Sequence, residues 1–593
     1  MRDPRLPTLA GDELSPHFRA RAEGHDYRAA LEHLLRELPL ERAELLMQRL
    51  RESRAAFATL SAVGRGRALL IGDALSGSAV GLARADLDVV LVDTDPHRLA
   101  FAADRDSALC DSTLCGSTDG SGARRSLDVV RADPRSPLPF ADSTFDLVVD
   151  ERGAPTESEL AELARVARGE VVFVADNRFA YKLSSGVRDD FRVMRPIALA
   201  RRALAPPHGE RTLTGWRGAA RGVGLPHTDA HALYPHRFDF SHVVALDGAG
   251  PKLTIGPMER ANRLKLAGKA LGLFPLLTPS FVLRASRTPL SSPWFEQVLE
   301  RLAHDLGEDT PRFEHLVATR GNTCVVLTHG PGWCIHAPLS PAQERQSRRH
   351  FEALSHLHER FPGFPAPTPL WEGVIDGRYL CVESRLSGLS APQLVGDLEA
   401  ASRTYADCAE ALASLVVEAR RPLEPTRLAL LIDGRVEAVA PRTGRSSTEQ
   451  AVHGIAERLT EELLDRPVPL VFHHSDLRAK HVQVRPTGEL VGFMDFGSYE
   501  RADLPGFDLL NLILHDRKQR TPGARIGDAW RACLENGFEP FEQSAIDRYA
   551  TLLELPDGYM DSILRALPLL VGAMAESNWD YSRPRWIHRS FGI

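Results

Sequence analysis

The sequence predicts an α/β protein made of two large domains, and three observations support this. Between Arg67 and Asp176, short apolar runs alternate with helical segments, a pattern typical of a parallel sheet with helical crossovers. A second strand-rich segment begins at Phe313, and the chain beyond residue 388 is mainly helical in pattern. The 593 residues, 43% hydrophobic and 25% charged, have the composition of a soluble globular protein.

Composition excludes several classes of protein. The 72 Lys and Arg residues against 79 Asp and Glu give a net charge of −7, which provides no general electrostatic reason to bind nucleic acid. Seven cysteines without a CxxC pair predict neither a disulfide framework nor a zinc module. The charge-free apolar stretch 270–283 is too short to be a transmembrane segment, and the first residues contain no apolar core of signal-peptide length. We therefore expect a cytoplasmic protein.

The first half of the chain begins with leucines at helical spacing, which predict helices over residues 26–60. The hydrophilic stretch 106–126 is typical of a loop. Short apolar runs predict strands at 68–72, 89–93, 127–133, 145–151 and 169–176.

The second half has its own order of elements. Strands are predicted at 315–321, 323–329, 333–339 and 377–388, with a helix at 343–360. The remainder reads as helical, apart from the apolar stretch 428–440 and a strand pair around 482–494. The predicted organisation is a helical segment at 1–60, a parallel-sheet domain with a carboxyl-terminal extension at 61–290, and a second domain at 310–593.

A first candidate site follows the strand at 68–72. Small residues fill the turn from Gly72 to Gly77, so a ligand could closely approach the backbone at the start of the next helix. Asp93 ends the second strand, where a carboxylate can accept both hydroxyls of a ribose, and Asp133 follows the third strand. This arrangement predicts a nucleotide-like ligand at one edge of the sheet.

These residues, with the stretch LPFADSTFDLVV, resemble the class I S-adenosylmethionine-dependent methyltransferases over residues 60–180. The resemblance implies a Rossmann-like domain in which the turn holds the methionine part, Asp93 the ribose and Asp133 the adenine. The turn departs from the glycine pattern of that family, because alanine and serine stand between Gly72 and Gly77; the cofactor-binding candidates there are Gly72, Ala74 and Gly77. Asp150, Glu151 and His227 are candidate bases.

A second candidate site lies in VFHHSDLRAKHVQVRPTGELVGFMDFG, residues 471–497. Its pattern is strand, loop, strand, tight turn, strand, and it ends in Asp495-Phe496-Gly497. Asp476 and Asp495 stand at the edges of this hairpin, so one can face a hydroxyl acceptor and the other a magnesium ion that bridges phosphates. Asp508, at the start of the following helix, is predicted to support the loop.

This segment resembles the aminoglycoside phosphotransferase and choline kinase-like group, which is related to protein kinases. The resemblance extends over most of 310–585 and implies a two-lobed, protein-kinase-like α+β domain. It assigns Asp476 as the catalytic base that orients or accepts the hydroxyl proton, and Asp495 as a metal ligand. His336 stands where the family has its phosphate-pairing lysine, with Glu344 or Glu352 as a facing acid.

His481 stands where the family has its metal-binding asparagine. Histidine is mostly neutral at pH 7, so His336 pairs phosphate more weakly than lysine does. Imidazole is also a poor ligand for magnesium, which prefers oxygen. An alternative interpretation makes His474, Asp476, His481 and Asp495 ligands of a transition metal.

Two classes of function follow. In the first, the chain is a methyltransferase that uses S-adenosylmethionine on a hydroxyl-bearing small molecule or glycan, fused to a kinase-like domain with a degenerate site. That domain would use ATP and Mg²⁺ if it is an active phosphotransferase, and would present the acceptor if it is a pseudokinase. In the second, the chain is a non-catalytic pseudoenzyme scaffold for ligands or partner biosynthetic enzymes.

Overall fold

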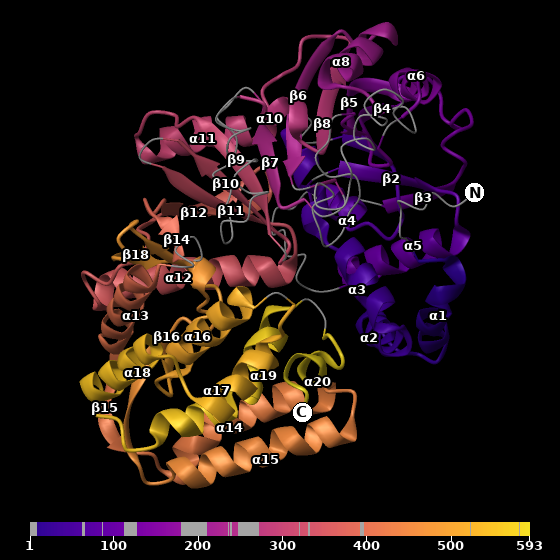
Figure 1. The fold of residues 1–593 in the computed structure, drawn as a ribbon. Helices are drawn as coiled ribbons and strands as arrows, with labels where there is room; N and C mark the ends of the chain where they lie inside the picture. Colours follow the sequence, from indigo (N-terminus) through magenta and orange to yellow (C-terminus); the bar gives the residue numbers. More distant parts are fainter. Residues whose placement is uncertain are drawn as a thin grey trace, which may run out of the picture. The chain divides into compact units, whose positions relative to one another are not determined.

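The computed structural model describes residues 9–61, 66–85, 87–111, 127–153, 155–178, 210–234, 236–237, 240–246, 272–319, 321–329, 332–391, 397–521, 523–579 and 582–593. They form two compact units (Figure 1). The first contains the described residues up to 344 together with 371–382, and the second contains 345–370 and 383–593. Among the described residues, no helix is long and apolar enough to cross a membrane.

The first unit begins with helices, and those between residues 26 and 60 lie where the leucine spacing predicts them. They are η1 (Gly11–Leu14), α1 (Ser15–Ala22), α2 (Tyr27–Glu37), α3 (Leu40–Arg49) and the 3₁₀ segment η2 (Glu52–Leu60). Asp26 caps α2, because its side chain accepts a hydrogen bond from the Ala29 amide at 2.7 Å. Leu31, Leu34 and Leu46 are buried along one face of these helices.

Five parallel strands follow, at the predicted positions. They are β1 (Gly66–Ile71), β2 (Leu87–Asp93), β3 (Leu127–Arg131), β4 (Phe145–Asp150) and β5 (Ala167–Asp176), with α4 (Ser78–Arg84), α5 (Pro96–Asp111) and α6 (Glu157–Val166) between them. Their order is β3-β2-β1-β4-β5, so the chain moves outward from β1 to β3 and returns to the other side at β4. Ligands of open α/β sheets bind at such a reversal, beyond the carboxyl ends of the strands.

The same sheet continues beyond β5 in antiparallel pairs. The chain adds α8 (Leu213–Gly222), β6 (His227–Tyr234), β7 (His242–Ala245), α10 (Phe274–Leu277), β8 (Ser280–Ser286), α11 (Trp294–Leu306), β9 (Phe313–Ala318), β10 (Thr323–Thr328), β11 (Trp333–Pro338), β12 (Pro369–Ile375) and β13 (Arg378–Ser384). β7 pairs with β9, with His242 opposite Val317, so the strands that begin at Phe313 extend the parallel sheet instead of starting a separate one. Within the described residues, the sheet has 13 strands in the order β12-β13-β11-β10-β9-β7-β6-β8-β5-β4-β1-β2-β3.

The second unit is mainly helical. The helix α12 (Pro341–Arg360) reaches into it, and its other helices are α13 (Leu398–Ala413), α14 (Pro425–Val439), α15 (Ser446–Leu463), α16 (Phe507–Arg520), α17 (Ile526–Asn536), α18 (Pro540–Leu552), α19 (Tyr559–Asn578) and α20 (Trp586–Phe591). Two antiparallel sheets have the orders β14-β17-β18 and β15-β16-β19. Their strands are β14 (Leu389–Ser390), β15 (Val416–Pro422), β16 (Pro467–His473), β17 (Val482–Val484), β18 (Leu490–Phe493) and β19 (Glu500–Asp503).

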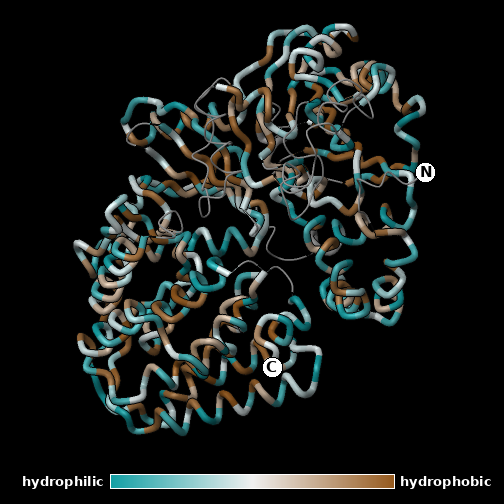
Figure 2. The backbone as a smooth tube through the Cα atoms, in the orientation of Figure 1, coloured by the Kyte–Doolittle hydropathy of each residue, from teal (hydrophilic) through white to brown (hydrophobic). Residues whose placement is uncertain are grey.

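The core of this unit is one continuous buried cluster that extends from Ala353 to Phe591. α14 packs against α15 and α19 (Figure 1). Figure 2 shows hydrophobic and hydrophilic residues alternating around α15, whose buried residues include Val452, Leu459 and Leu463. These residues recur at helical spacing, so a single stripe of the helix faces the core.

The stretch 428–440, which the sequence set apart from its helical surroundings, is helical too. It forms most of α14, which has Pro425 in its first turn and buries Leu428, Ile432 and Val439. A short apolar run does not by itself distinguish a strand from a helix. Here the buried positions fall at i, i+4 and i+11, and proline favours the start of a helix.

Residues 49–55 of the first unit cover the turn after β1. The Gly77 amide donates to the Arg49 carbonyl at 2.8 Å. A Cβ atom added at Gly77 would lie 2.2 Å from the carbonyl carbon and oxygen of Arg51, and one added at Gly81 would lie 2.6 Å from the Cβ atom of Ala55. The small residues at these two positions therefore permit close packing of the chain's own backbone.

We predict that Gly77→Ala destabilises the first unit by about 1–3 kcal/mol, the usual cost of forcing an extra carbon into a packed site. Gly218→Ala is the matched control, since a Cβ atom there meets nothing within 4 Å and α8 should gain from alanine. Urea unfolding of both variants checks the prediction. Equal midpoints would contradict the close packing of residues 49–55.

Candidate functional site

Asp93 fastens the turn after β1 to the end of β2. Its side chain is buried, and one carboxylate oxygen accepts from the Ala74 amide at 2.9 Å. The other accepts from the Asp95 amide at 3.0 Å and from Arg98 Nη2 at 2.6 Å. The structure thus brings Ala74 and Asp93 together as predicted, and the carboxylate expected to hold a ribose is engaged by the protein itself.

The other predicted residues of this edge lie nearby. Gly72 faces Glu151 of the neighbouring strand end, where an added Cβ atom would lie 3.4 Å from the Glu151 side chain. Asp133 is exposed, and its side chain accepts only a local hydrogen bond, from the Arg135 amide at 3.0 Å, among the described residues. The backbone connects the two acids, because the Ala132 amide donates to the Asp93 carbonyl at 3.2 Å.

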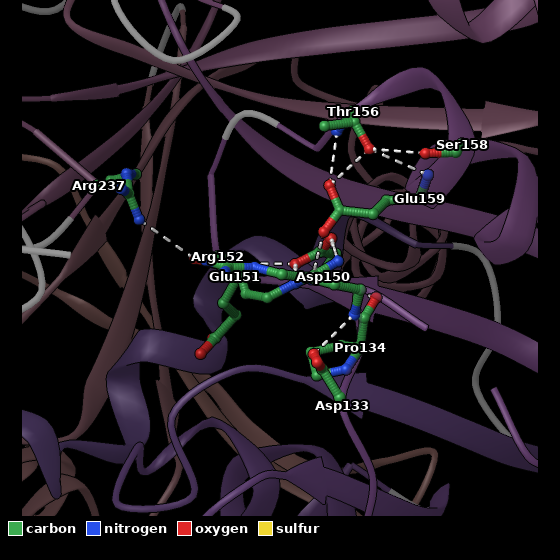
Figure 3. Close-up of polar contacts among 10 residues, drawn as sticks. Asp133, Pro134, Asp150, Glu151, Arg152, Thr156, Ser158, Glu159 and Arg237 are labelled. Carbon is green, nitrogen blue, oxygen red and sulfur yellow. Dashed lines mark hydrogen bonds and ion pairs between the residues drawn. The ribbon is translucent and has the colours of Figure 1, made fainter. Parts of the chain in front are cut away.

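An ion-pair network lies at the end of β4 (Figure 3). Asp150 is fully buried and accepts from Arg152 Nη2 at 2.7 Å, and Arg152 also donates to Glu159 at 2.9 Å. Arg237 donates to the Glu151 carbonyl at 3.4 Å and pairs with Asp176 at 3.0 Å. Asp150 is therefore committed to a structural ion pair.

Glu151 differs from its neighbour Asp150. Its carboxylate accepts from the Ser78 hydroxyl, and burial raises its pKa despite the opposing charges of Arg54 and Arg49. A carboxyl group with a raised pKa at the reversal of a parallel sheet is a candidate proton acceptor. His227, the third candidate base, is exposed at the start of β6.

The second site is built on the loop between β16 and β17, whose backbone is held by one carboxylate. Asp508, buried at the start of α16, accepts from the His474 amide at 2.7 Å and from the Ser475 amide at 2.8 Å. Ser475 has a φ of 65°, an uncommon backbone conformation for a residue with a side chain. Asn511 adds a hydrogen bond to the Leu477 carbonyl at 3.0 Å. The expected supporting role of Asp508 is confirmed.

Asp476 is the acid that this loop presents. Its side chain is half-buried, and it accepts a hydrogen bond from Arg478 Nε at 2.7 Å. Burial raises the pKa of Asp476, with a further contribution from the negative charge of Asp495, while Arg478 opposes the shift. A raised pKa makes a carboxylate a better proton acceptor.

Asp495 and His481 meet at the other side of this loop. Asp495 follows β18 with a φ of 73°, and its Oδ2 atom lies 3.2 Å from His481 Nε2. His481 is buried and donates through Nδ1 to the Asp476 carbonyl at 2.7 Å. Burial lowers the pKa of His481 well below the ordinary value, while the negative charge of Asp495 opposes this shift. The structure therefore places the three predicted residues of this site together.

His474 joins the same loop to the strand before Asp495. Its Nε2 atom donates to the Met494 carbonyl at 2.9 Å, and its ring stacks on that of His481 with centroids 5.6 Å apart. His474 therefore connects the loop to the residue that precedes Asp495.

Sequence reasoning missed His350. It lies buried on α12, where its Nε2 atom donates to Glu383 at 2.6 Å and its Nδ1 atom accepts from the Phe496 amide at 2.9 Å. His350 thus fixes the backbone next to Asp495. The sequence shows His350 only as a polar residue on the apolar face of a predicted helix, and this pattern does not reveal which residues it contacts.

His336 lies in the first unit, and Glu352, one of the two acids predicted to face it, lies in the second. His336 is half-buried on β11, opposite Val325 of β10, with its Nε2 atom 3.6 Å from the Sγ atom of Cys334. Within the second unit, Glu352 pairs with Arg501. The pairing of His336 with a phosphate stays a prediction.

The model of the phosphotransferase enzyme family matches residues 282–589, more than half of the 593. The chain belongs to this family. The expected kinase-like fold of the carboxyl-terminal region is thereby confirmed, and the α/β class agrees with the sheet. None of the curated proteins matches the chain in sequence.

Solved structures similar to the chain include the aminoglycoside phosphotransferase APH(3'')-Id from Streptomyces rimosus, with 19% identity over 47% of this chain and 98% of that one, at a TM-score of 0.29. WbdD bound to a kinase inhibitor is 12% identical over 85% of this chain and 88% of its own, at 0.24. Phosphoethanolamine N-methyltransferase 2 from Haemonchus contortus is 14% identical over 40% and 52%, at 0.24. TM-scores of this size assign no activity to the chain.

We predict that Asp508→Ala destabilises the second unit by about 1–3 kcal/mol for each buried amide left unpaired. The control is Asp561→Ala, since Asp561 also lies in the first turn of a helix, α19, but is exposed. Thermal unfolding of both variants measures the difference. A loss no larger than that of the control would contradict the loop-holding role of Asp508.

Proposed function

We propose that the second unit transfers the γ-phosphoryl group of ATP to a hydroxyl group on a small molecule or glycan. The observation that carries this proposal is the placement of Asp476, whose loop backbone is held by Asp508 and whose carboxylate has a raised pKa. Membership in the phosphotransferase enzyme family supports the same reaction class.

The proposed step is an in-line displacement at phosphorus. The acceptor oxygen forms a bond to the γ-phosphorus while the bond to the leaving oxygen of ADP breaks, and the hydroxyl proton passes to Asp476. Arg478 holds one carboxylate oxygen at 2.7 Å and so orients the base. Asp495 and His481 would hold a divalent cation, which supplies neutralisation of phosphate charge when it is bound.

We predict that Asp476→Asn lowers kcat by roughly 10²–10⁴-fold, the contribution of a positioned general base, while leaving ATP affinity unchanged. The exposed Asp433→Asn on α14 is the control for the substitution itself. Steady-state ATP turnover and nucleotide titration give the two quantities. Unchanged kcat in Asp476→Asn would contradict the assignment of the base.

The pH profile tests the same residue. Only the deprotonated carboxylate accepts a proton, so activity should fall as pH decreases through the raised pKa of Asp476. Arg478 lowers that pKa, and Arg478→Gln should therefore move the acidic limb of the profile to higher pH. If the acidic limb of the profile does not move in this variant, the limb reports the titration of a group other than Asp476.

For the first unit we propose an S-adenosylmethionine-dependent methyltransferase that acts on a hydroxyl-bearing acceptor. The reversal of strand order between β1 and β4 supports this, with the small-residue turn at its edge. Asp133 is exposed beside that edge and is available to an adenine ring. Because Asp93 is engaged and residues 49–52 pack on Gly77, the cofactor would bind only after local rearrangement of this turn.

We predict that S-adenosylmethionine binds the full chain and that Asp133→Ala weakens it by about 1–3 kcal/mol. Asp133 is preferable to Asp93 as a probe, since removing Asp93 would also unpair Arg98 and the turn. Exposed Asp128 on β3 provides the control, Asp128→Ala. Calorimetric titration measures all three proteins. No binding by the parent chain would contradict the methyltransferase proposal, and no binding of ATP either would favour the non-catalytic scaffold.

A further inference from the structure

One face of α16 follows the loop that carries Asp476. Four polar residues of this helix recur at helical spacing and so lie on one stripe: Asp508, Asn511, His515 and Lys518. The first two hold the loop, through the amides of residues 474 and 475 and the carbonyl of Leu477. The next two, His515 and Lys518, therefore continue along the loop beyond Leu477.

The permanent charges beside His515 are positive. Arg478 and Lys480 lie on the loop, and the short 3₁₀ turn η7 (Ala479–His481), which contacts α16, exposes Lys480 between two buried residues. Burial lowers the pKa of His515 well below its ordinary value, and the positive charges of Arg478, Lys518 and Lys480 lower it further. Three cations from two elements thus lie near one half-buried imidazole.

The placement of lysine is selective. Of the 72 Lys and Arg residues, six are lysines, and those in the part of the chain that the structure describes are Lys480 and Lys518. The arginines on the other side of α16 have acidic partners on α18, since Arg517 and Arg520 donate to Glu542 at 3.0 and 2.9 Å. Lysine carries a compact charge on a flexible stem, which suits carboxylate and phosphate groups without a fixed orientation.

Positive charges that converge in this way favour a negatively charged ligand and disfavour a positively charged one. Resting on the phosphotransferase function proposed above, we propose that the acceptor carries an anionic group, a carboxylate or a phosphate. This group binds Lys480 and Lys518 while the hydroxyl group of the acceptor faces Asp476.

The phosphates of ATP are the other anions of this site, and the two lysines differ in their relation to them. The charge of Lys480 acts on both Asp476 and Asp495, so Lys480 lies near the base and near the proposed metal ligand. Lys518 lies about two helical turns beyond Asn511 on α16. Lys518 is therefore the residue whose substitution separates the acceptor from the nucleotide.

The test uses the full chain saturated with magnesium and AMP-PNP, an ATP analogue that cannot transfer its γ-phosphate readily. Four probes with one hexose ring and different charges are titrated by saturation-transfer NMR: glucose, glucosamine, glucuronic acid and glucose 6-phosphate. We expect the two anionic probes to bind about tenfold more tightly than glucose, and glucosamine to bind most weakly. A larger gain for glucose 6-phosphate would identify a phosphorylated acceptor, and a larger gain for glucuronic acid a carboxylated one.

The variant Lys518→Gln should lose the preference for anionic probes and retain the parent affinities for glucose and AMP-PNP. Its control is Arg458→Gln, which removes an exposed positive charge from α15 and should keep the preference. Lys480→Gln is a second variant, in which the anionic probes should also bind more weakly.

Three results would overturn the inference. They are equal affinities for the four probes, no binding of the anionic probes, and a preference that Lys518→Gln leaves unchanged. Weaker AMP-PNP binding in Lys518→Gln, with unchanged binding of the probes, would assign this lysine to the nucleotide and overturn it as well. Failure of the parent chain to bind AMP-PNP would instead contradict the phosphotransferase function on which the inference rests.

Discussion

The loop that carries Asp476 takes its shape from the carboxylate of Asp508. This side chain accepts hydrogen bonds from two consecutive backbone amides, those of His474 and Ser475. These bonds stabilise Ser475 at a positive φ, which few non-glycine residues adopt. With the backbone turned in this way, Asp476 is presented beside Arg478, and its own carbonyl accepts from His481. Asp476, the proposed base, and His481, a candidate metal ligand, thus belong to one hydrogen-bonded loop. Displacement of either residue should affect the other.

The first unit has a comparable organising feature in residues 49–55. This segment meets the turn after β1 through Gly77, and the Glu52 amide donates to the Asn322 side chain at 2.9 Å in the turn between β9 and β10. β7 pairs with β9 in the same unit, so the parallel strands and the hairpin strands form one sheet. The turn at Gly77 and the turn between β9 and β10 therefore both contact residues 49–52, and their strands belong to the same sheet.

Much of this fold follows from periodicity. The apolar runs predicted the positions of strands β1 to β5 and β9 to β11. Strands that are buried in a sheet are recognisable as short, nearly continuous runs of hydrophobic residues. The run at 428–440 was misleading, since a helix that packs on two neighbours carries apolar residues on a wide face. Pairing of β7 with β9 could not be predicted, because strand partners are set by tertiary packing and not by local pattern.

The sequence indicated which acidic residues belong to the candidate sites, but it did not indicate which residues contact them. Asp476, His481 and Asp495 were identified by their motif, but the ring orientation of His481 depends on a carbonyl five residues earlier in the chain. Likewise, the sequence identified Asp93 as an acid at the end of a strand. It did not reveal that Arg98 and the Ala74 amide donate hydrogen bonds to its carboxylate. His350 reaches Phe496 across 146 residues of sequence, a contact that no spacing rule contains.

The central claim is that the second unit is an active phosphotransferase. Formation of ADP from ATP by the full chain with magnesium(II), compared between the parent and Asp495→Ala, tests it most directly. The account predicts steady ADP formation by the parent and none by the variant above the rate without protein. Equal rates in the two proteins, or no turnover by a parent chain that binds magnesium and ATP, would contradict it.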